Sequence, residues 1–155
     1  MDIKRILVPT DFSPAGRPAI EAACSFARRF GAMIDLLHVW ELPVAIAPAM
    51  LLTPPVGPPL AAAEFIRGHA GQEMERLVGQ LRAPGLEVRG RLESGHPAET
   101  ILRIAESDGA DLIVMGTHGR TGISHLLMGS VAERVVRRAT CAVLTVRGRG
   151  AADAG

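Results

Sequence analysis

The chain has 155 residues, of which 48% are hydrophobic and 21% are charged. That composition is typical of a folded globular domain and excludes an intrinsically disordered chain. Seventeen Lys and Arg residues against sixteen Asp and Glu residues leave a net charge of +1, which argues against nucleic acid as a partner because phosphate-backbone binding needs a basic excess or patch.

The alternation of apolar runs predicts strands and helices in turn over the first half of the chain. Residues 3–8 form an apolar run that predicts a buried strand ending at Pro9. Ser13 and Pro14 predict a helix entrance, although Pro18 would clash a full turn into a helix. Apolar residues at helical spacing predict a helix from 20 to 30, which Gly31 ends.

The same pattern continues after this helix. Residues 33–39 predict a second strand, and residues 42–60, rich in Pro and Ala, predict a long loop that is either functional or unstructured. The remaining expected elements are a helix at 61–81, a strand at 86–92, a helix opened by Pro97, a strand at 111–115, a glycine-rich loop at 116–130, a helix at 131–138 with Val131, Val135 and Val136 inward, and a strand at 142–146.

This order of elements predicts an α/β fold with a five-stranded parallel sheet and helices on both faces, of the flavodoxin or Rossmann type. We expect one domain over residues 1–147 and a flexible tail over 148–155. Ligands in such sheets bind outside the carboxyl ends of the strands, where the strand order reverses. The segments after the first and fourth strands are therefore the candidate ligand site.

The cysteines and the apolar segments bear on the compartment. Cys24 and Cys141 are far apart and form no C-x-x-C pair, so a zinc ribbon or thioredoxin-type site is excluded and two packed thiols in a reducing compartment are expected. The N-terminal sequence lacks the apolar stretch of a signal peptide. Prolines interrupt the most apolar segment, 42–63, which argues against a membrane span. We expect a cytoplasmic protein with no membrane partner.

The segment after the fourth strand has the residues of a phosphate site. Gly116 and Gly119 allow a sharp turn and a close approach of the backbone to a ligand. Gly129 and Ser130 stand at the entrance to the last helix, where backbone N–H groups and the helix dipole attract an anion. Ordinary turn glycines are the alternative, but the strand before and the helix after favour phosphate binding. Since Lys4 is the one lysine, a lysine-dependent phosphate loop further along is excluded.

The spacing Gly116-x2-Gly119-x9-Gly129-Ser130 resembles the nucleotide signature of the ATP-binding branch of the universal stress protein family. The opening run 6–13, the segments 37–39 and 110–116, and the ending 141–146 are also similar to that family. The resemblance covers nearly the whole chain. It implies an ATP-binding protein, usually a dimer, with a fold like that of the adenine-nucleotide alpha hydrolases.

The resemblance also implies the site residues and the partner surface. Asp11 would contact ribose hydroxyls or the water shell of a bound Mg²⁺ or Mn²⁺, with no direct metal ligand from the protein. The strand 142–146, apolar and unguarded, would pair with a second copy in a homodimer. The implied contacts are Pro9, Thr10, Asp11 and Val39 around adenine and ribose, Met115 and Gly116 in the same pocket, and Gly119, Gly129, Ser130 and Val131 at the phosphates.

Catalytic roles are less favoured than binding. His118 and His125 lie in the glycine-rich loop, where a histidine is more often solvated than a general base. Arg120 either pairs with a phosphate or points to solvent. No G-x-S-x-G elbow surrounds Ser124, and Cys141 is expected to be a packed thiol.

We therefore expect no catalytic residue and a nucleotide-binding module or switch in a stress response. A slow ATPase or autophosphorylating enzyme is one alternative, because phosphoryl transfer depends mainly on positioning and charge stabilisation. A nucleotide-free dimeric interaction protein is another. AMP or a cyclic nucleotide in place of ATP also stays open.

Overall fold

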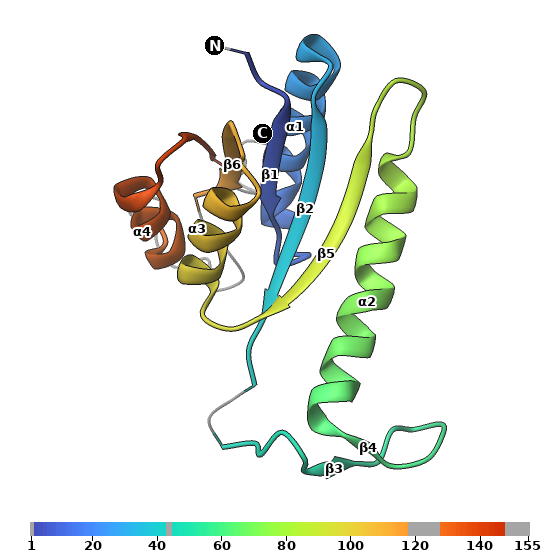
Figure 1. Ribbon diagram of the computed structural model, residues 1–155. Coiled ribbons are helices and arrows are strands. Elements are labelled where there is room, and N and C mark those ends of the chain that lie inside the picture. Colours follow the sequence, from blue (N-terminus) through green and yellow to red (C-terminus); the bar gives the residue numbers. More distant parts are fainter. Residues whose placement is uncertain (1, 43–44, 118–127, 148–155) are drawn as a thin grey trace, which may run out of the picture.

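In the computed structural model, residues 2–42, 45–117 and 128–147 are described. Five strands form one parallel sheet in the order β5-β2-β1-β6-β7 (Figure 1). The order reverses between β1 and β6, as expected of a doubly wound sheet. The predicted fold class is confirmed, with strands at Arg5–Pro9 (β1), Met33–Trp40 (β2), Val88–Ser94 (β5), Leu112–Gly116 (β6) and Ala142–Val146 (β7).

Four helices cover the two faces of this sheet (Figure 1). Alternate strand residues point to opposite faces, and the core divides accordingly. Ile6 and Leu36 pack with the first two helices, whereas Leu7 and Leu37 pack with the last two. The helices are Arg17–Phe30 (α1) and Ala62–Leu81 (α2) on one face, and Pro97–Ser107 (α3) and Ser130–Arg138 (α4) on the other. No helix in the described part of the chain is long and apolar enough to cross a membrane.

The helix entrance after β1 differs from the prediction. Pro14–Gly16 form a separate 3₁₀ turn (η1), and the Ser13 side chain makes no capping hydrogen bond. The helix α1 begins only at Arg17, so Pro18 stands in the first turn, where a missing N–H breaks no helical hydrogen bond. The predicted end is confirmed, because Gly31 adopts the left-handed conformation with φ of 65°.

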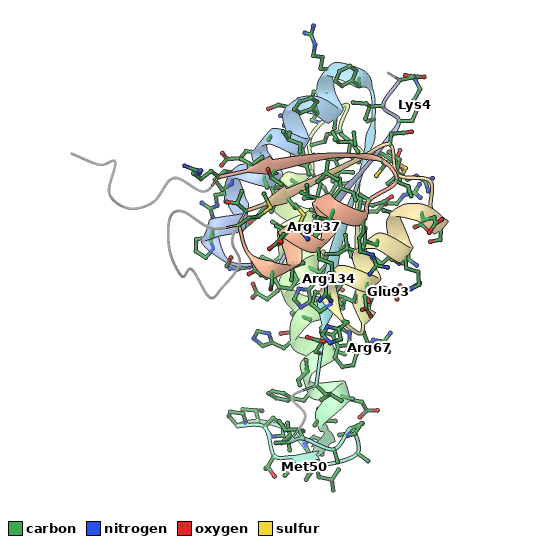
Figure 2. The ribbon with its side chains drawn as sticks, turned by 90° about the vertical axis from the view of Figure 1, so that its left-hand side faces the viewer. Lys4, Met50, Arg67, Glu93, Arg134 and Arg137 are labelled. Carbon is green, nitrogen blue, oxygen red and sulfur yellow. The ribbon has the colours of Figure 1, made fainter. Side chains whose placement is uncertain are left out.

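The sequence predicted that the proline-rich segment is a long loop, and this prediction is wrong in part. It contains an antiparallel hairpin of two short strands, Leu51–Leu52 (β3) and Leu60–Ala61 (β4). Together with the first turns of α2, this hairpin projects away from the sheet (Figures 1 and 2). Residues 45–61 are called the arm below. Some of its large apolar side chains lie in solvent, with Leu51 68% and Val56 90% exposed.

Two smaller expectations are corrected. The third predicted strand is displaced, because Leu86 lies in a bridge with Ala83 before β5 begins at Val88. Val136 was expected to face inward but is 46% exposed. The buried residues of α4 are Ala132 and Val135, and this narrow stripe leaves Val136 on the flank of the helix.

Candidate functional site

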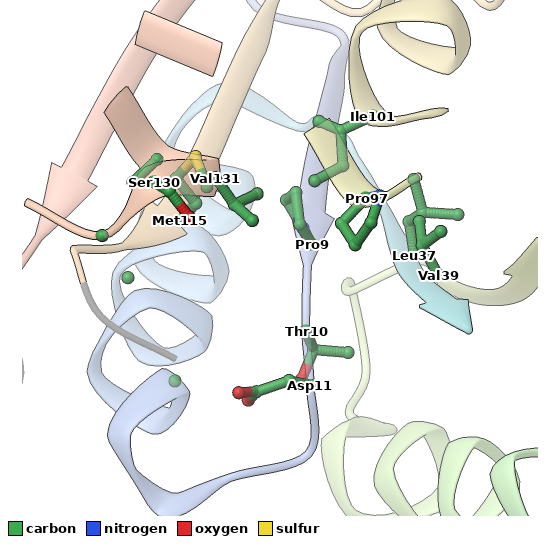
Figure 3. Close-up of a pocket in the computed structure, with 14 residues that line it drawn as sticks. Pro9, Thr10, Asp11, Leu37, Val39, Pro97, Ile101, Met115, Ser130 and Val131 are labelled. Carbon is green, nitrogen blue, oxygen red and sulfur yellow. The ribbon is translucent and has the colours of Figure 1, made fainter. Parts of the chain in front are cut away.

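A cavity of about 280 Å³ opens at the carboxyl edge of the sheet, where β1 and β6 lie side by side and the strand order reverses (Figure 3). Nine of the eleven site residues expected from the sequence line this cavity. Gly119 and Arg120 lie outside the described residues, as do His118, Ser124 and His125. The nine are Pro9, Thr10, Asp11, Val39, Met115, Gly116, Gly129, Ser130 and Val131.

One part of the cavity has apolar walls. Leu37 from β2 and Met115 from β6 are buried at its base, with 1% and 5% of their surface exposed. Pro97 and Ile101 complete the wall from α3 (Figure 3). Walls of this kind suit a flat, largely apolar group such as a nucleobase.

Pro97 and Ile101 are site residues that the sequence reasoning missed. Pro97 reads from the sequence as the first residue of a helix, and Ile101 as part of the buried helical stripe. Both readings are correct, because Pro97 opens α3 and Ile101 is 3% exposed. Their second role has one signal in the sequence: α3 follows directly on the carboxyl end of β5, the edge where ligands bind.

The start of α4 supplies hydrogen-bond donors to the cavity. Gly129 precedes this helix in an extended conformation, and no side chain caps the helix. The first N–H groups of a helix have no partner within it, so those of Ser130 and Val131 suit an anion. The Gly129 N–H donates to the Thr117 carbonyl at 2.7 Å. That bond brings the start of α4 next to the end of β6.

The loop after β1 closes the other end of the cavity. The Thr10 N–H donates to the Leu37 carbonyl at 2.8 Å, which extends the β1–β2 pairing beyond Pro9. The Ser13 N–H donates to Asp11 Oδ1 at 2.9 Å. Figure 3 shows Asp11 and Thr10 at one end of the cavity, apart from the cluster around Met115 and Ser130. A carboxylate in this place suits hydroxyl donors or metal-bound water.

The charge of the described lining is negative. Asp11 is the one charged side chain among the described lining residues, and no Lys or Arg is found with it. Over the described ranges, no group of three His, Cys, Asp or Glu side chains is placed to hold a metal ion. The donors that these residues offer to an anion are therefore backbone N–H groups and the hydroxyls of Thr10 and Ser130.

Comparison with known proteins gives one consistent family. The model of the universal stress protein family matches residues 2–147. Universal stress protein MJ0531 of Methanocaldococcus jannaschii is 34% identical over 144 residues, which cover 93% of this chain and 82% of that protein.

Solved structures share the fold. The structure of the protein MJ0577, also of Methanocaldococcus jannaschii, superposes with a TM-score of 0.71 at 27% identity, covering 97% of this chain and all of that one. A universal stress protein in complex with cAMP has a TM-score of 0.69 at 21% identity, covering 96% of this chain and 100% of its own. The universal stress protein of Archaeoglobus fulgidus in complex with dAMP has a TM-score of 0.66 at 23% identity, with coverage of 95% and 100%.

Proposed function

Because the chain belongs to the universal stress protein family, we propose that it binds ATP and acts as a nucleotide-binding module or switch in a cytoplasmic stress response. One observation carries the proposal: residues from four separate segments, expected from the sequence to bind a nucleotide, line one cavity. The cAMP and dAMP complexes of two structural neighbours add support for an adenine nucleotide.

The chemistry of the cavity fits the parts of a nucleotide. In this proposal, the base lies between the apolar walls of β2, β6 and α3, with Val39 and Met115 beside it. The phosphates face the N–H groups of Ser130 and Val131 and the backbone of Gly129 at the start of α4. Gly119 belongs to the same proposed phosphate contacts, and Arg120 is proposed as a further one. A Mg²⁺ or Mn²⁺ ion on the phosphates would keep its water shell and meet Asp11 through water.

Binding is favoured over catalysis. Asp11 is the one titratable side chain among the described lining residues. In this proposal it meets the water shell of the metal ion, which leaves no described lining residue as a general base. We therefore propose a binding module, not an efficient hydrolase.

We also propose that two copies of the chain form a homodimer by pairing along β7. This strand is the last in the sheet order, so one of its backbone edges is unpaired within the chain. Its residues are all half-buried, and the neighbouring helix α4 exposes Val136. An apolar edge strand without charges is a surface on which a second copy can pair.

Calorimetric titration of the purified chain with ATP, with and without Mg²⁺, tests the proposal, with AMP and cAMP as comparison ligands. We expect saturable ATP binding that is tighter with Mg²⁺. The variant Val131→Asp places a carboxylate at the proposed phosphate contacts and should weaken ATP binding more than tenfold, by about 1.4 kcal/mol or more. Val131→Thr has nearly the same size without the charge and should bind as the parent does.

Three outcomes would change the conclusion. Absence of binding by any adenine nucleotide, in protein that carries no trapped nucleotide, would leave a nucleotide-free interaction protein as the better reading. Equal affinity for AMP and ATP would show that the phosphates are not recognised. Phosphate release far above background, abolished by Val131→Asp, would establish the enzyme instead.

A further inference from the structure

The loop Thr10–Ser13, which carries Asp11 to the cavity, contains a strained residue. Phe12 has φ of 63° and is the one non-glycine residue with positive φ in the described part of the chain. A residue with a Cβ atom adopts this left-handed conformation only at a cost in free energy. Contacts of the surrounding structure must therefore hold the loop in place.

Hydrogen bonds within the loop account for only part of its conformation. The Phe12 N–H donates to Thr10 Oγ1 at 3.1 Å, and the Ser13 N–H donates to Asp11 Oδ1 at 2.9 Å. Both bonds join residues two apart, so they shape the turn without fixing it to the sheet. The Ser13 hydroxyl is buried with no hydrogen-bond partner. Behind the loop, between α1 and α2, lies a second cavity of about 510 Å³, which Phe12 and Ser13 line in part. Phe12 also packs against the core on this face of the sheet.

His38 of β2 contacts the loop from behind. Leu37 and Val39 point into the nucleotide cavity, so strand alternation places His38 on the opposite face of the sheet. Its Nδ1 lies 2.8 Å from the Thr10 carbonyl oxygen. Because a carbonyl only accepts, Nδ1 must carry the hydrogen. The His38 ring also lies against the Phe12 ring, with centroids 4.4 Å apart and planes inclined by 31°.

These two contacts flank Asp11 in the sequence. Thr10 is held on both sides of its backbone, through its N–H by the Leu37 carbonyl and through its own carbonyl by His38. Phe12, on the other side of Asp11, is held by its ring. His38 itself does not line the cavity that Asp11 lines. Through these two contacts, His38 acts on the site by way of the loop.

We propose that His38 is a positioning residue of the nucleotide site, which fixes the Thr10–Ser13 loop so that Asp11 is preorganised for the ligand. The inference rests on the proposed function, because it assigns a role in binding at the same site. Preorganisation raises affinity by sparing the ligand the cost of ordering the loop.

Two substitutions separate the hydrogen bond from the ring contact. His38→Phe keeps a ring beside Phe12 but loses the donor to Thr10. His38→Asn places an amide N–H close to the position of Nδ1 but loses the ring. We expect His38→Phe to raise the Kd for ATP about tenfold, as for the loss of one hydrogen bond. We expect the Kd of His38→Asn for ATP to stay within about threefold of the parent value, because this variant keeps a donor for the Thr10 carbonyl.

A double-mutant cycle with Asp11→Ala shows whether the effect passes through the loop. If His38 acts by positioning Asp11, the His38→Phe penalty should nearly vanish once Asp11 is alanine. A ligand-free measurement accompanies it: amide hydrogen exchange at Phe12 and Ser13 should accelerate in His38→Phe while exchange in the strand β6 stays unchanged.

The outcomes are distinct. If the parent chain binds no adenine nucleotide, the proposed function fails and this role in binding fails with it. If the parent binds ATP but His38→Phe binds equally well, or its penalty persists in the Asp11→Ala background, only the positioning role is overturned. Failure of His38→Phe to fold, or a general acceleration of exchange, would make His38 a structural residue and overturn the inference as well.

Discussion

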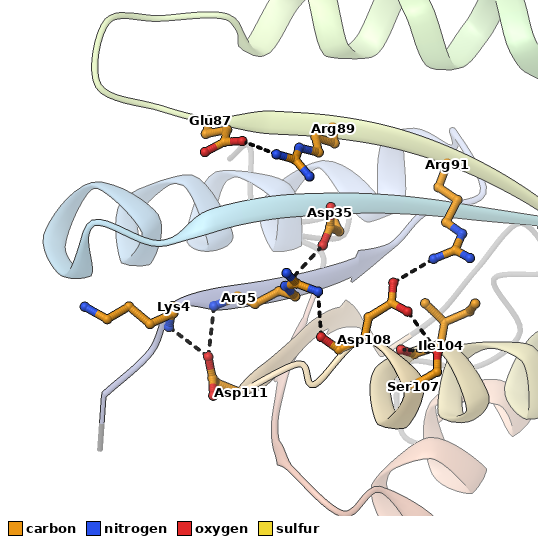
Figure 4. Close-up of polar contacts among 10 residues, drawn as sticks. All are labelled: Lys4, Arg5, Asp35, Glu87, Arg89, Arg91, Ile104, Ser107, Asp108 and Asp111. Atoms are coloured by element: carbon orange, nitrogen blue, oxygen red, sulfur yellow. Dashed lines mark hydrogen bonds and ion pairs between the residues drawn. The ribbon is translucent and has the colours of Figure 1, made fainter.

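Arg5 and Asp111 exchange two hydrogen bonds across the start of the sheet. The Asp111 N–H donates to the Arg5 carbonyl at 3.0 Å, and the Arg5 N–H donates to Asp111 Oδ2 at 2.9 Å. The same Oδ2 accepts the Lys4 N–H at 2.8 Å, and Figure 4 shows both bonds to this carboxylate. These bonds join β1 to the residue that leads into β6, so they set the two central strands side by side at the end opposite the cavity.

The hydrogen bonds to the Asp111 carboxylate predict that the stability of the fold depends on pH. The backbone N–H groups of Lys4 and Arg5 hold the pKa of the Asp111 carboxyl below its ordinary value. The stabilisation is therefore complete above the unfolded-state pKa, near 3.9, and is lost as pH falls through the lower folded-state pKa. At pH 7, Asp111→Ala should lower the free energy of unfolding by about 1–2 kcal/mol.

The matched variant for this test is Asp111→Asn, which keeps an acceptor oxygen without the charge. The difference in urea stability between parent and Asp111→Asn should be measurable at pH 7 and should shrink toward pH 3. A difference that stays constant over this range would contradict the role of the charge.

A larger side chain on the wall of the cavity should compete with the nucleotide for space. Val39→Phe adds a ring to a lining residue of a cavity of about 280 Å³, and should weaken ATP binding at least tenfold, by about 1.4 kcal/mol. The melting temperature should change little, because Val39 is only half-buried. Val56→Phe, at a 90% exposed position on the arm, is the control. Equal affinity of both variants in calorimetry would argue against the assigned base position.

Any side chain at Gly90 should clash with the residues of α2 that pack on β5. A Cβ atom at this glycine of β5 would lie 2.5 Å from Met74 Cγ and 3.0 Å from Val78 Cγ2. Since Met74 is 5% exposed, it has little room to move. Gly90→Ala should therefore cost about 1–3 kcal/mol.

Shortening the facing side chain should relieve that conflict. Met74→Ala alone opens a void and should cost about 2–5 kcal/mol. The double variant should cost less than the sum of the two changes, because the new methyl group occupies part of the void. Urea unfolding measures all three, and strict additivity would contradict the contact.

The edge of β7 predicts how to separate the proposed dimer. The Val146 carbonyl accepts the Thr117 N–H at 3.1 Å, so it points to β6. Alternate residues of a parallel strand point their backbone groups the other way, which directs the Thr145 N–H to the open edge. Thr145→Pro removes this donor and should give a folded monomer in sedimentation equilibrium.

Val146→Pro is the matched control for the edge. It removes the backbone N–H on the β6 side of the strand and should therefore lower the free energy of unfolding more than Thr145→Pro does. A parent chain that is itself monomeric would contradict the dimer, and a dimeric Thr145→Pro variant would place the interface elsewhere.

The sheet and the cavity were predictable because both depend on order along the chain. Alternating apolar runs give parallel strands, and the segments that follow β1 and β6 must then meet at one edge. Thr10 and Ser130 are 120 positions apart in the sequence, yet both line the cavity. No contact between them had to be foreseen, since the topology alone brings them together.

The features that were not predicted depend on local geometry or on neighbours. The hairpin of the arm has strands of two residues, too short for any period, and is fixed by backbone bonds such as Ala62 N–H to the Met50 carbonyl at 2.7 Å. Ile101 serves the core and the cavity with one side chain, which a helical stripe cannot reveal. Phe12 has positive φ, and its ring lies against His38, a contact across 26 positions that no local pattern encodes.

The surface chemistry has a practical consequence. Sixteen of the seventeen basic residues are arginine, so Lys4 carries the one side-chain amine. Figure 2 shows Lys4 at the end of the molecule away from the arm, and its side chain is 68% exposed. A reagent that couples to lysine would tether the protein there, at the amino edge of the sheet. The cavity at the carboxyl edge would then face away from the support, which leaves it open to a ligand in solution.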